Sequence, residues 1–212
     1  MAPKYPTLDF EQNLWNAGYS HIAGIDEAGR GAWAGPVCAA AVILPPEPSL
    51  TSILPQVRDS KLMTPLARET WAPRIRAVAL AWGVGFASSQ EIDNLGILSS
   101  TKLAALRALS ELCPAIPSRV PLLPDYLLTD YLLFPSLDLP QTALVKGDQL
   151  SLSVAAASVL AKTARDAHMR ELDGGYPGYG FARHKGYGTH IHQLAIRQLG
   201  LCEIHRKSFS IT

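Results

Sequence analysis

The stretch HIAGIDEAGRGAWAGPVCAAAVIL, residues 21–44, decides how this 212-residue chain is interpreted. Residues 21–27 alternate in the manner of a strand, and residues 36–44 form a continuous apolar run of strand length. A glycine-rich connection joins the two segments. We therefore predict two neighbouring strands of a partly buried sheet.

Similar patterns continue along the chain. Strands are predicted over residues 78–88, 125–130 and 142–148, and helices over residues 64–77, 97–112, 152–172 and 189–199. Pro73 is expected to kink or shorten the first helix, and Ser99 or Ser100 to cap the second. A proline-rich connector is expected over residues 113–124. This order predicts an α/β sheet with helices on its faces and a helical C-terminal part.

Length and composition limit the class of protein. A chain of 212 residues fits one domain with a substantial core. No apolar run reaches the roughly 18 residues that a membrane span needs. Cys38, Cys113 and Cys202 are far apart and match no metal or disulfide spacing, which favours packing roles in a reducing compartment. These features predict a cytoplasmic protein with no membrane association.

Charge is distributed unevenly along the chain. Residues 1–159 hold 11 Lys and Arg against 14 Asp and Glu, whereas residues 160–212 hold 8 against 4 and five of the six histidines. An acidic part that could hold metal, beside a basic part that could hold phosphate, is typical of an enzyme that acts on a polyanion. Ordinary surface scatter is the alternative interpretation.

Four acids lie at the ends or edges of predicted strands: Asp26, Glu27, Asp130 and Asp148. Ligands of open α/β sheets bind at strand ends, so these carboxylates could converge on a hard cation, Mg²⁺ or Mn²⁺ rather than zinc. Adjacent strand residues point to opposite faces, so Asp26 and Glu27 can share a site only if the strand ends or bends there. Singly, Asp148 could instead cap a helix or occupy a turn, and Asp130 could simply close a strand.

Several short motifs are suited to binding a sugar–phosphate chain. Glycines allow close backbone approach, arginine offers a phosphate fork, and tyrosine can stack on a ribose or base. Each motif could also be a solvated surface. The candidate substrate contacts are Gly29, Arg30, Gly31, Ser60, Lys61, Lys146, Arg183, His184, Lys185, Tyr187 and Arg206.

Taken together, the motifs GIDEAGRG, DSK, VKGDQ, ASVLAK with RD, HKGYGT and HRKSF, in that order, resemble bacterial ribonuclease HII, the type 2 ribonuclease H family. The resemblance runs from about Ile22 to Phe209. It implies a ribonuclease H-like fold, with a mixed five-stranded sheet, flanking helices and a C-terminal helical region. The chain would be one catalytic domain, residues 1–212, whose residues 174–212 form a helical substrate-binding part.

The resemblance also implies an activity and its residues. It implies a metal-dependent endonuclease that hydrolyses the RNA strand of RNA/DNA hybrids and cuts 5′ to ribonucleotides embedded in duplex DNA, leaving 3′-hydroxyl and 5′-phosphate ends. Asp26, Glu27, Asp130 and Asp148 match its four catalytic, metal-binding acids, which would hold two Mn²⁺ or Mg²⁺ ions. The Gly29–Gly31 loop and Tyr187 match the elements that recognise the 2′-hydroxyl at an RNA–DNA junction. A monomeric enzyme is expected.

Two departures from the family pattern are visible. The family usually has glycine after the third acid, whereas Tyr131 follows Asp130 here, so Asp125 and Asp138 are alternative candidates. Ala155 replaces a frequent serine, a change expected to be harmless. Two other classes also remain open. A carboxylate-pair hydrolase such as a glycosidase would need no metal, and an inactive nucleic-acid-binding module would bind a hybrid without cutting it.

Overall fold

The computed structural model describes residues 5–114 and 122–211, and most of the predicted connector over residues 113–124 lies outside them. Its sheet has the strand order β4-β3-β2-β1-β5-β6. Strands β1 to β4 are antiparallel neighbours, whereas β5 and β6 run parallel to β1. The predicted mixed sheet is confirmed, and the two-residue β4 adds a sixth strand at its edge. The strands are β1 Ile22–Ala28, β2 Val37–Ile43, β3 Ala81–Ala87, β4 Cys113–Pro114, β5 Tyr126–Asp130 and β6 Gln141–Leu144.

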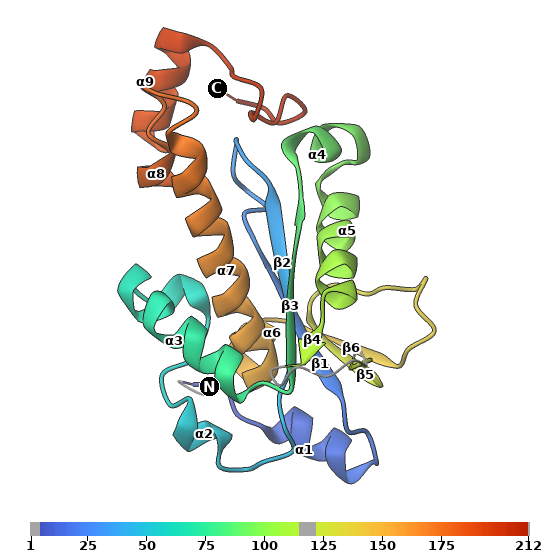
Figure 1. The fold of residues 1–212 in the computed structure, drawn as a ribbon. Helices are drawn as coiled ribbons and strands as arrows, with labels where there is room; N and C mark the ends of the chain where they lie inside the picture. The colour runs from blue at the N-terminus through green and yellow to red at the C-terminus, as the bar shows by residue number, and fades with distance from the viewer. Residues whose placement is uncertain (1–4, 115–121, 212) are drawn as a thin grey trace.

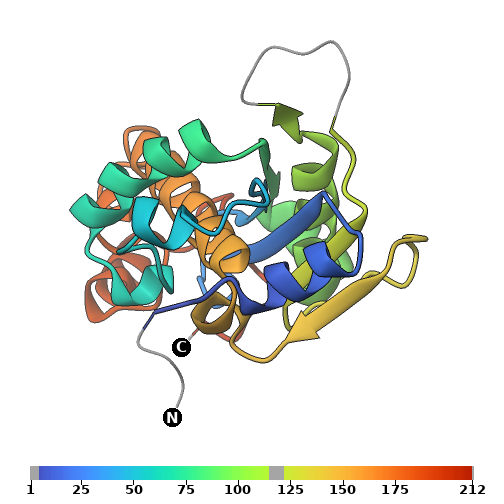
Figure 2. The same cartoon turned by 90° about the horizontal axis from the view of Figure 1, so that it is seen from below.

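Helices cover both faces of this sheet. Helices α7 and α3 lie on one side and α5 on the other, while α8 and α9 lie beyond the far end of α7 (Figure 1). Figure 2 shows the same layers from below. The helices are α1 Asp9–Asn16, α2 Leu50–Ile53, the 3₁₀ turn η1 Ser60–Leu62, α3 Pro65–Val78, α4 Ser89–Leu95, α5 Ile97–Ser110, α6 Gly147–Leu150, α7 Leu152–Asp173, α8 Phe181–His184 and α9 His190–Leu199.

Two sequence-based details differ in the structure. Helix α3 runs through Pro73, so of the two expected effects of this proline the shortening does not occur. Helix α5 begins after Gly96, so Ser99 and Ser100 lie inside it rather than at its cap. A separate helix, α4, precedes it and is capped by Ser88, whose side chain accepts a hydrogen bond from the backbone of Glu91. A second capped helix therefore occupies the stretch immediately before α5.

Glycines let the two helix layers approach the strands closely. A Cβ at Gly24 of β1 would lie 2.3 Å from the backbone of Ser153 in α7, and one at Gly83 of β3 would lie 2.1 Å from the carbonyl oxygen of Ala108 in α5. Neither strand position can carry a side chain without moving its helix. Glycines that weaken a strand prediction therefore mark the helix–sheet contacts.

The start of α7 is fixed by a buried carboxylate. Glu11 of α1 is 1% exposed, and its Oε1 accepts hydrogen bonds from Ser151 Oγ at 2.6 Å and from Ser153 N at 2.9 Å. The backbone N–H groups at a helix start have no partner within the helix, so this carboxylate stabilises the first turn of α7. The contact fixes the helix next to the strand that carries Asp26.

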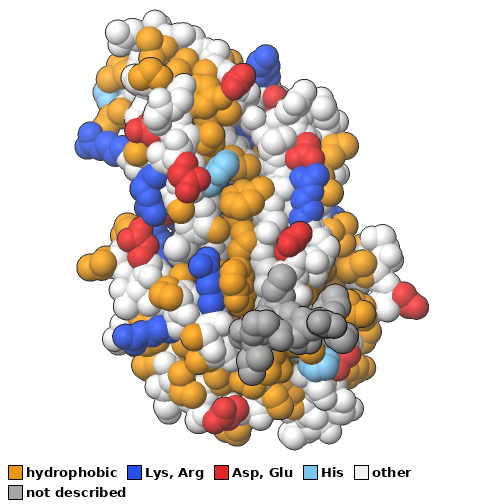
Figure 3. All heavy atoms as spheres, viewed as in Figure 1, with side chains coloured by type: hydrophobic (Ala, Val, Ile, Leu, Met, Phe, Trp, Pro, Cys, Tyr) orange, Lys and Arg blue, Asp and Glu red, His pale blue; other side chains and the backbone are white. Residues whose placement is uncertain are grey.

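The surface mixes charges of both signs. On the face shown in Figure 3, basic and acidic side chains are interspersed among apolar ones. Within residues 5–114 and 122–211, no helix combines the length and the apolar character needed to cross a membrane.

Candidate metal centre and adjoining pocket

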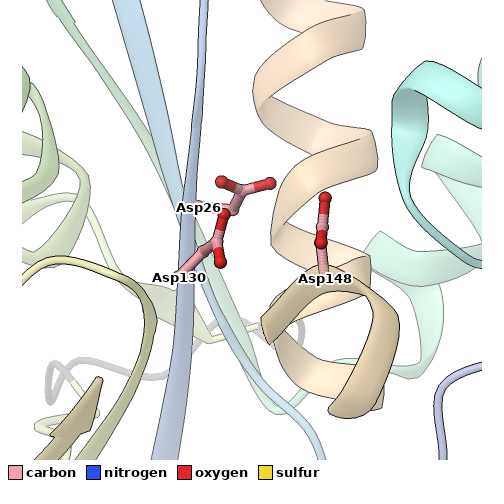
Figure 4. Close-up of side chains that lie close together, drawn as sticks. All are labelled: Asp26, Asp130 and Asp148. Carbon is pink, nitrogen blue, oxygen red and sulfur yellow. The ribbon is translucent and has the colours of Figure 1, made fainter. Parts of the chain in front are cut away.

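Three aspartates from separate segments converge at one place. Asp26 comes from β1, Asp130 from the end of β5 and Asp148 from α6, and one carboxylate oxygen of each lies within 4.8 Å of the others. Their side chains point toward one another (Figure 4). The alternative candidates Asp125 and Asp138 are not in this group. The predicted convergence of acids distant in sequence is therefore present for three of the four.

Local backbone structure places each aspartate. Asp130 Oδ1 accepts a hydrogen bond from Gly147 N at 2.8 Å, which ties the end of β5 to the start of α6. Strand β6 ends at Leu144, so Asp148 lies in the first turn of α6 and not at a strand end. The turn between them uses Lys146 in the left-handed conformation, with φ 59°.

Glu27 is arranged differently from its neighbour Asp26. Strand β1 continues to Ala28 and pairs with β2 through both acids, so the strand does not end between them. The Glu27 carboxylate stands outside the aspartate group and approaches Arg30, with 3.2 Å between Oε1 and Nη1. The Asp26 carboxylate instead accepts a hydrogen bond from Glu27 N at 2.7 Å. Glu27 therefore borders the aspartate group on the side of the Gly29–Gly31 loop.

The electrostatics of the cluster favour binding of a cation or a proton. Burial, with repulsion from Glu27 and Asp130, raises the pKa of Asp26 well above its usual value. Burial, with repulsion from Asp59 and Asp130, raises the pKa of Asp148 to about 7. Burial also raises the pKa of Glu27, although Arg30 opposes the shift. Neighbouring buried carboxylates that resist ionisation are stabilised when a cation joins them.

Lys61 is the cation nearest to Asp148. Its Nζ lies 3.8 Å from Asp148 Oδ2, and the ammonium is largely exposed. Partial burial of the Lys61 side chain lowers its pKa, but attraction by Asp26, Asp59 and Asp148 outweighs this effect and raises the pKa above its usual value. One exposed ammonium at this distance neutralises the buried carboxylates only in part.

Unpaired oxygens show that the site suits a hard metal ion. Asp26 Oδ2 and Glu27 Oε2 are buried and have no hydrogen-bond partner among the described residues. Buried acceptors without partners are costly, and a divalent cation would satisfy them. Because the group contains oxygen ligands without histidine or cysteine, it fits Mg²⁺ or Mn²⁺.

Tyr131 occupies the position where the sequence departs from the family pattern. Its φ is 66°, in the left-handed region that glycine adopts easily, and its side chain is 68% exposed. A non-glycine residue in this region costs about 1–2 kcal/mol. The backbone turn after Asp130 is therefore kept despite the missing glycine, and the carboxylate still joins the aspartate group.

An open pocket of about 740 Å³ adjoins the cluster. Seven predicted residues line it: the acid Glu27 and the substrate contacts Gly29, Arg30, Gly31, Ser60, Lys61 and Tyr187. The rest of the lining comes from Ala28, Arg68, Ile97, Lys162 and Phe209. The pocket brings the Gly29–Gly31 loop and Tyr187 together, although they are more than 150 residues apart in sequence. It combines cationic and aromatic side chains beside carboxylates, a composition suited to a sugar–phosphate chain.

The other predicted contacts lie elsewhere. His184 and Arg206 are buried and hydrogen bond to backbone atoms. Burial lowers the pKa of Arg206 to about 9, and its Nη1 donates to the carbonyl oxygen of Arg30. Arg206 thus stabilises the Gly29–Gly31 loop from the interior of the protein. Lys146 and Arg183 are exposed outside the pocket, and Lys185 is half-buried with its Nζ on Ala182 O.

Helix α7 supplies two residues that lie in the motifs ASVLAK and RD but were not predicted as site residues. Lys162 lines the pocket and pairs with Asp166 at 2.7 Å. Arg165 is fully buried and donates to the carbonyl oxygens of Pro36 and Lys185. Charged residues in an otherwise alanine-rich helix were the available sequence signal, but only the fold shows that they face the two loops. Both cationic groups lie near the Tyr187 ring, with Lys162 Nζ 5.2 Å from its centroid.

Comparison with known proteins identifies close relatives. The family model described as Ribonuclease HII matches residues 23–212. The ribonuclease HII of Syntrophotalea carbinolica is 52% identical over 202 residues, which cover 95% of this chain and 91% of that protein. The crystal structure of ribonuclease H2 from Pyrococcus horikoshii superimposes with a TM-score of 0.70 at 24% identity, covering 90% of this chain and 94% of that one. The crystal structure of Bst-RNase HIII in complex with Mn²⁺ superimposes with a TM-score of 0.66 at 20% identity, covering 92% of this chain and 68% of that one.

Proposed function

The chain belongs to the ribonuclease HII family, a family of endonucleases that cleave the RNA of RNA/DNA hybrids, and from this premise we propose how its residues divide that work. The carboxylates of Asp26, Glu27, Asp130 and Asp148 would bind divalent ions, and the pocket beside them would bind the substrate. The observation that carries the proposal is the convergence of three aspartates from β1, β5 and α6 within 4.8 Å. Family membership removes support for the glycosidase and the inactive binding module.

The proposed metal site would hold Mg²⁺ or Mn²⁺. Two such ions supply an activated water and neutralise charge on the leaving 3′ oxygen. The Asp26 carboxylate is fixed by the hydrogen bond that it accepts from Glu27 N, and the Asp130 carboxylate by the one that it accepts from Gly147 N. Each aspartate keeps at least one oxygen free of these backbone contacts, and that oxygen is suited to a metal ion. Glu27, beside Arg30, would bind at the pocket side of the cluster.

The proposed substrate site uses backbone and aromatic contacts. The 2′-hydroxyl is the group by which a protein distinguishes RNA from DNA at a given position. Gly29 and Gly31 would let backbone amides approach it, and Arg30 would contact a phosphate. Stacking of Tyr187 on the following deoxyribose would disfavour a second 2′-hydroxyl there. This arrangement supports cutting 5′ to a ribonucleotide at an RNA–DNA junction, as in ribonucleotide excision repair.

The test is cleavage of a DNA duplex containing one ribonucleotide, with Mg²⁺, with Mn²⁺ and with EDTA. We expect a single nick on the 5′ side of the ribonucleotide, with 3′-hydroxyl and 5′-phosphate ends, in either metal and none in EDTA. Asp26→Asn should abolish the nick and leave hybrid binding largely intact, while the exposed Asp138→Asn serves as the matched control. Undiminished turnover by Asp26→Asn, or cleavage in EDTA, would refute the metal assignment.

Further properties stay predictions. We expect the enzyme to act as a monomer in the cytoplasm on RNA/DNA hybrids and on ribonucleotide-containing DNA. Residues 174–212 would form the helical substrate-binding part, because Tyr187 and Phe209 of this segment line the pocket. The distribution of charge supports this, since residues 160–212 carry a net positive charge.

A further inference from the structure

Tyr187 is presented by an unusual backbone turn. Lys185 and Gly186 both have left-handed φ angles, 56° and 80°, immediately before the tyrosine. A Cβ at Gly186 would lie 2.3 Å from the carbonyl oxygen of Ala34, so the turn is pressed against the segment that follows the Gly29–Gly31 loop. Trp33 N donates to Gly186 O at 2.8 Å across this contact. A turn in this conformation needs partners that hold it.

His184 is the first of these partners. Gly186 N lies 3.2 Å from His184 Nδ1, and Tyr179 O lies 2.8 Å from His184 Nε2. A backbone N–H can only donate and a carbonyl oxygen can only accept. His184 must therefore be neutral, with its proton on Nε2, to bridge the two groups.

A chain of hydrogen bonds through two further histidines reaches Tyr187 from the other side. His205 Nδ1 lies 2.9 Å from Cys202 N and 3.3 Å from Cys202 O; the shorter contact is with a group that can only donate, so we place the His205 proton on Nε2. That atom is 3.0 Å from His192 Nε2, which must accept. The His192 proton then lies on Nδ1, 3.0 Å from Tyr187 O. One N–H fixes the direction of every bond in the chain.

The surroundings keep the three rings neutral. His192 and His205 are fully buried and His184 is 7% exposed. Burial lowers the pKa of His192 to about 4 and also lowers those of His184 and His205. The charged groups near His184 are Asp173, Lys185 and Arg183, while His192 faces the other two histidines. A proton added to His192 Nε2 would point at the N–H of His205 and break the chain.

We propose that His184, His192 and His205 are positioning residues that set the backbone of Tyr187 for recognition of the substrate. The proposal rests on the proposed role of Tyr187 at the RNA–DNA junction. The His184 and His192 rings also stack, with their centroids 4.3 Å apart, and the edge of Phe181 packs against both. Packing alone would need rings of the right shape, whereas positioning needs one particular tautomer in each ring.

The first test is a measurement of the tautomers by ¹⁵N–¹H NMR of the unmodified protein. We expect protons on Nε2 of His184, on Nδ1 of His192 and on Nε2 of His205 at pH 7, and the proton on His192 should stay in place down to pH 5.5. A proton on His192 Nε2, or titration of His192 near pH 6.5, would overturn the proposal. This result does not depend on whether the protein cuts any substrate.

The second test separates positioning from packing. His192→Leu keeps a buried side chain without a donor, and we expect a loss of about tenfold in kcat/KM on a single embedded ribonucleotide with little change on a long hybrid. His192→Asn keeps an N–H near the position of Nδ1 and should recover most of the loss. The matched control is Tyr179→Phe, which removes the hydrogen bond from Tyr179 Oη to Gly200 O in the same cluster. It should leave unchanged the substrate ratio, which is kcat/KM on a single embedded ribonucleotide divided by kcat/KM on a long hybrid.

A double variant links the effect to the tyrosine. If His192 acts through Tyr187, then His192→Leu should reduce the ratio no further in a protein that already carries Tyr187→Ala. Equal losses on both substrates, or no rescue by His192→Asn, would overturn the positioning role. If Tyr187→Ala alone leaves the ratio unchanged, the proposed role of Tyr187 fails, and the NMR measurement still reports separately on the hydrogen-bond chain.

Discussion

Replacing Asp148 by asparagine should stabilise the metal-free protein at alkaline pH. The pKa of this carboxyl is raised from 3.8 to about 7, mainly by burial and then by repulsion from Asp59 and Asp130. At about 1.4 kcal/mol per pKa unit, that difference corresponds to about 4 kcal/mol, and solvent screening at the open pocket reduces it to about 2 kcal/mol. The folded protein therefore holds an ionised Asp148 at a cost that asparagine does not carry.

The sign of the pH dependence follows from linkage. Because the folded-state pKa lies above the unfolded-state value, the folded protein binds more protons between pH 3.8 and about 7. Stability falls as the pH rises through this window and levels off above it. The advantage of Asp148→Asn should thus be small near pH 4, under half of its maximum at pH 5 and complete at pH 8.

The assay is urea unfolding in EDTA at pH 5 and pH 8, followed by circular dichroism. The exposed Asp138→Asn is the matched control and should change the free energy of unfolding at neither pH. Adding Mg²⁺ or Mn²⁺ at pH 8 should stabilise the unmodified protein more than Asp148→Asn, since the variant lacks one of the proposed ligands. A variant that is less stable than the unmodified protein in EDTA at pH 8, or equally shifted at both pH values, would refute the reasoning.

Three further changes have defined outcomes. Tyr131→Gly should raise stability by up to about 1 kcal/mol in thermal unfolding, because relief of the left-handed strain exceeds the entropy cost of glycine; a lower melting temperature would contradict this. Gly29→Ala should cost about 2–4 kcal/mol, because its Cβ would lie 1.9 Å from Arg165 Nε at φ 93°, whereas Gly31→Ala, with nothing within 4 Å, should unfold close to the original temperature. Lys61→Met should shift the acid limb of the pH–rate profile to higher pH, since Lys61 lowers the pKa of the nearby carboxylates; an unchanged limb would count against that contact.

Much of the fold could be predicted because hydrophobic periodicity survives in a single sequence. The two strands in residues 21–44 and the long helix over residues 152–172 agree with β1, β2 and α7 to within one or two residues. The predicted cap of α5 was wrong because a separate helix, α4, precedes it. Ser88 and Glu91, three residues apart, form the capping box of α4, and that helix ends only at Leu95. The serines at positions 99 and 100 favoured a helix start at that point, but the boundary between two successive helices depends on how each packs against the sheet.

The site was less predictable than the fold, for a physical reason. Acids at strand ends could be recognised, yet whether Asp148 lies on a strand or in the turn of α6 depends on Lys146 adopting a left-handed conformation. Basic residues could be recognised in the sequence too, but the sequence did not show which of them face solvent. Arg206 and His184 are buried against backbone carbonyls, and this follows from the docking of the C-terminal segment rather than from local sequence.

The buried Arg165 explains why the candidate metal centre and the loops proposed to recognise the substrate form a single unit. Arg165 donates to Ala34 O and Lys185 O, so one guanidinium joins the segment after the Gly29–Gly31 loop to the turn that presents Tyr187. Burying a cation is costly, and carbonyl oxygens offset that cost only when both loops are in place. Helix α7 carries Arg165 and begins directly after α6, which holds Asp148. A displacement of α7 would therefore move Asp148 of the cluster and Lys162 of the pocket together, so the fold couples the proposed sugar-recognition site to the proposed cleavage site.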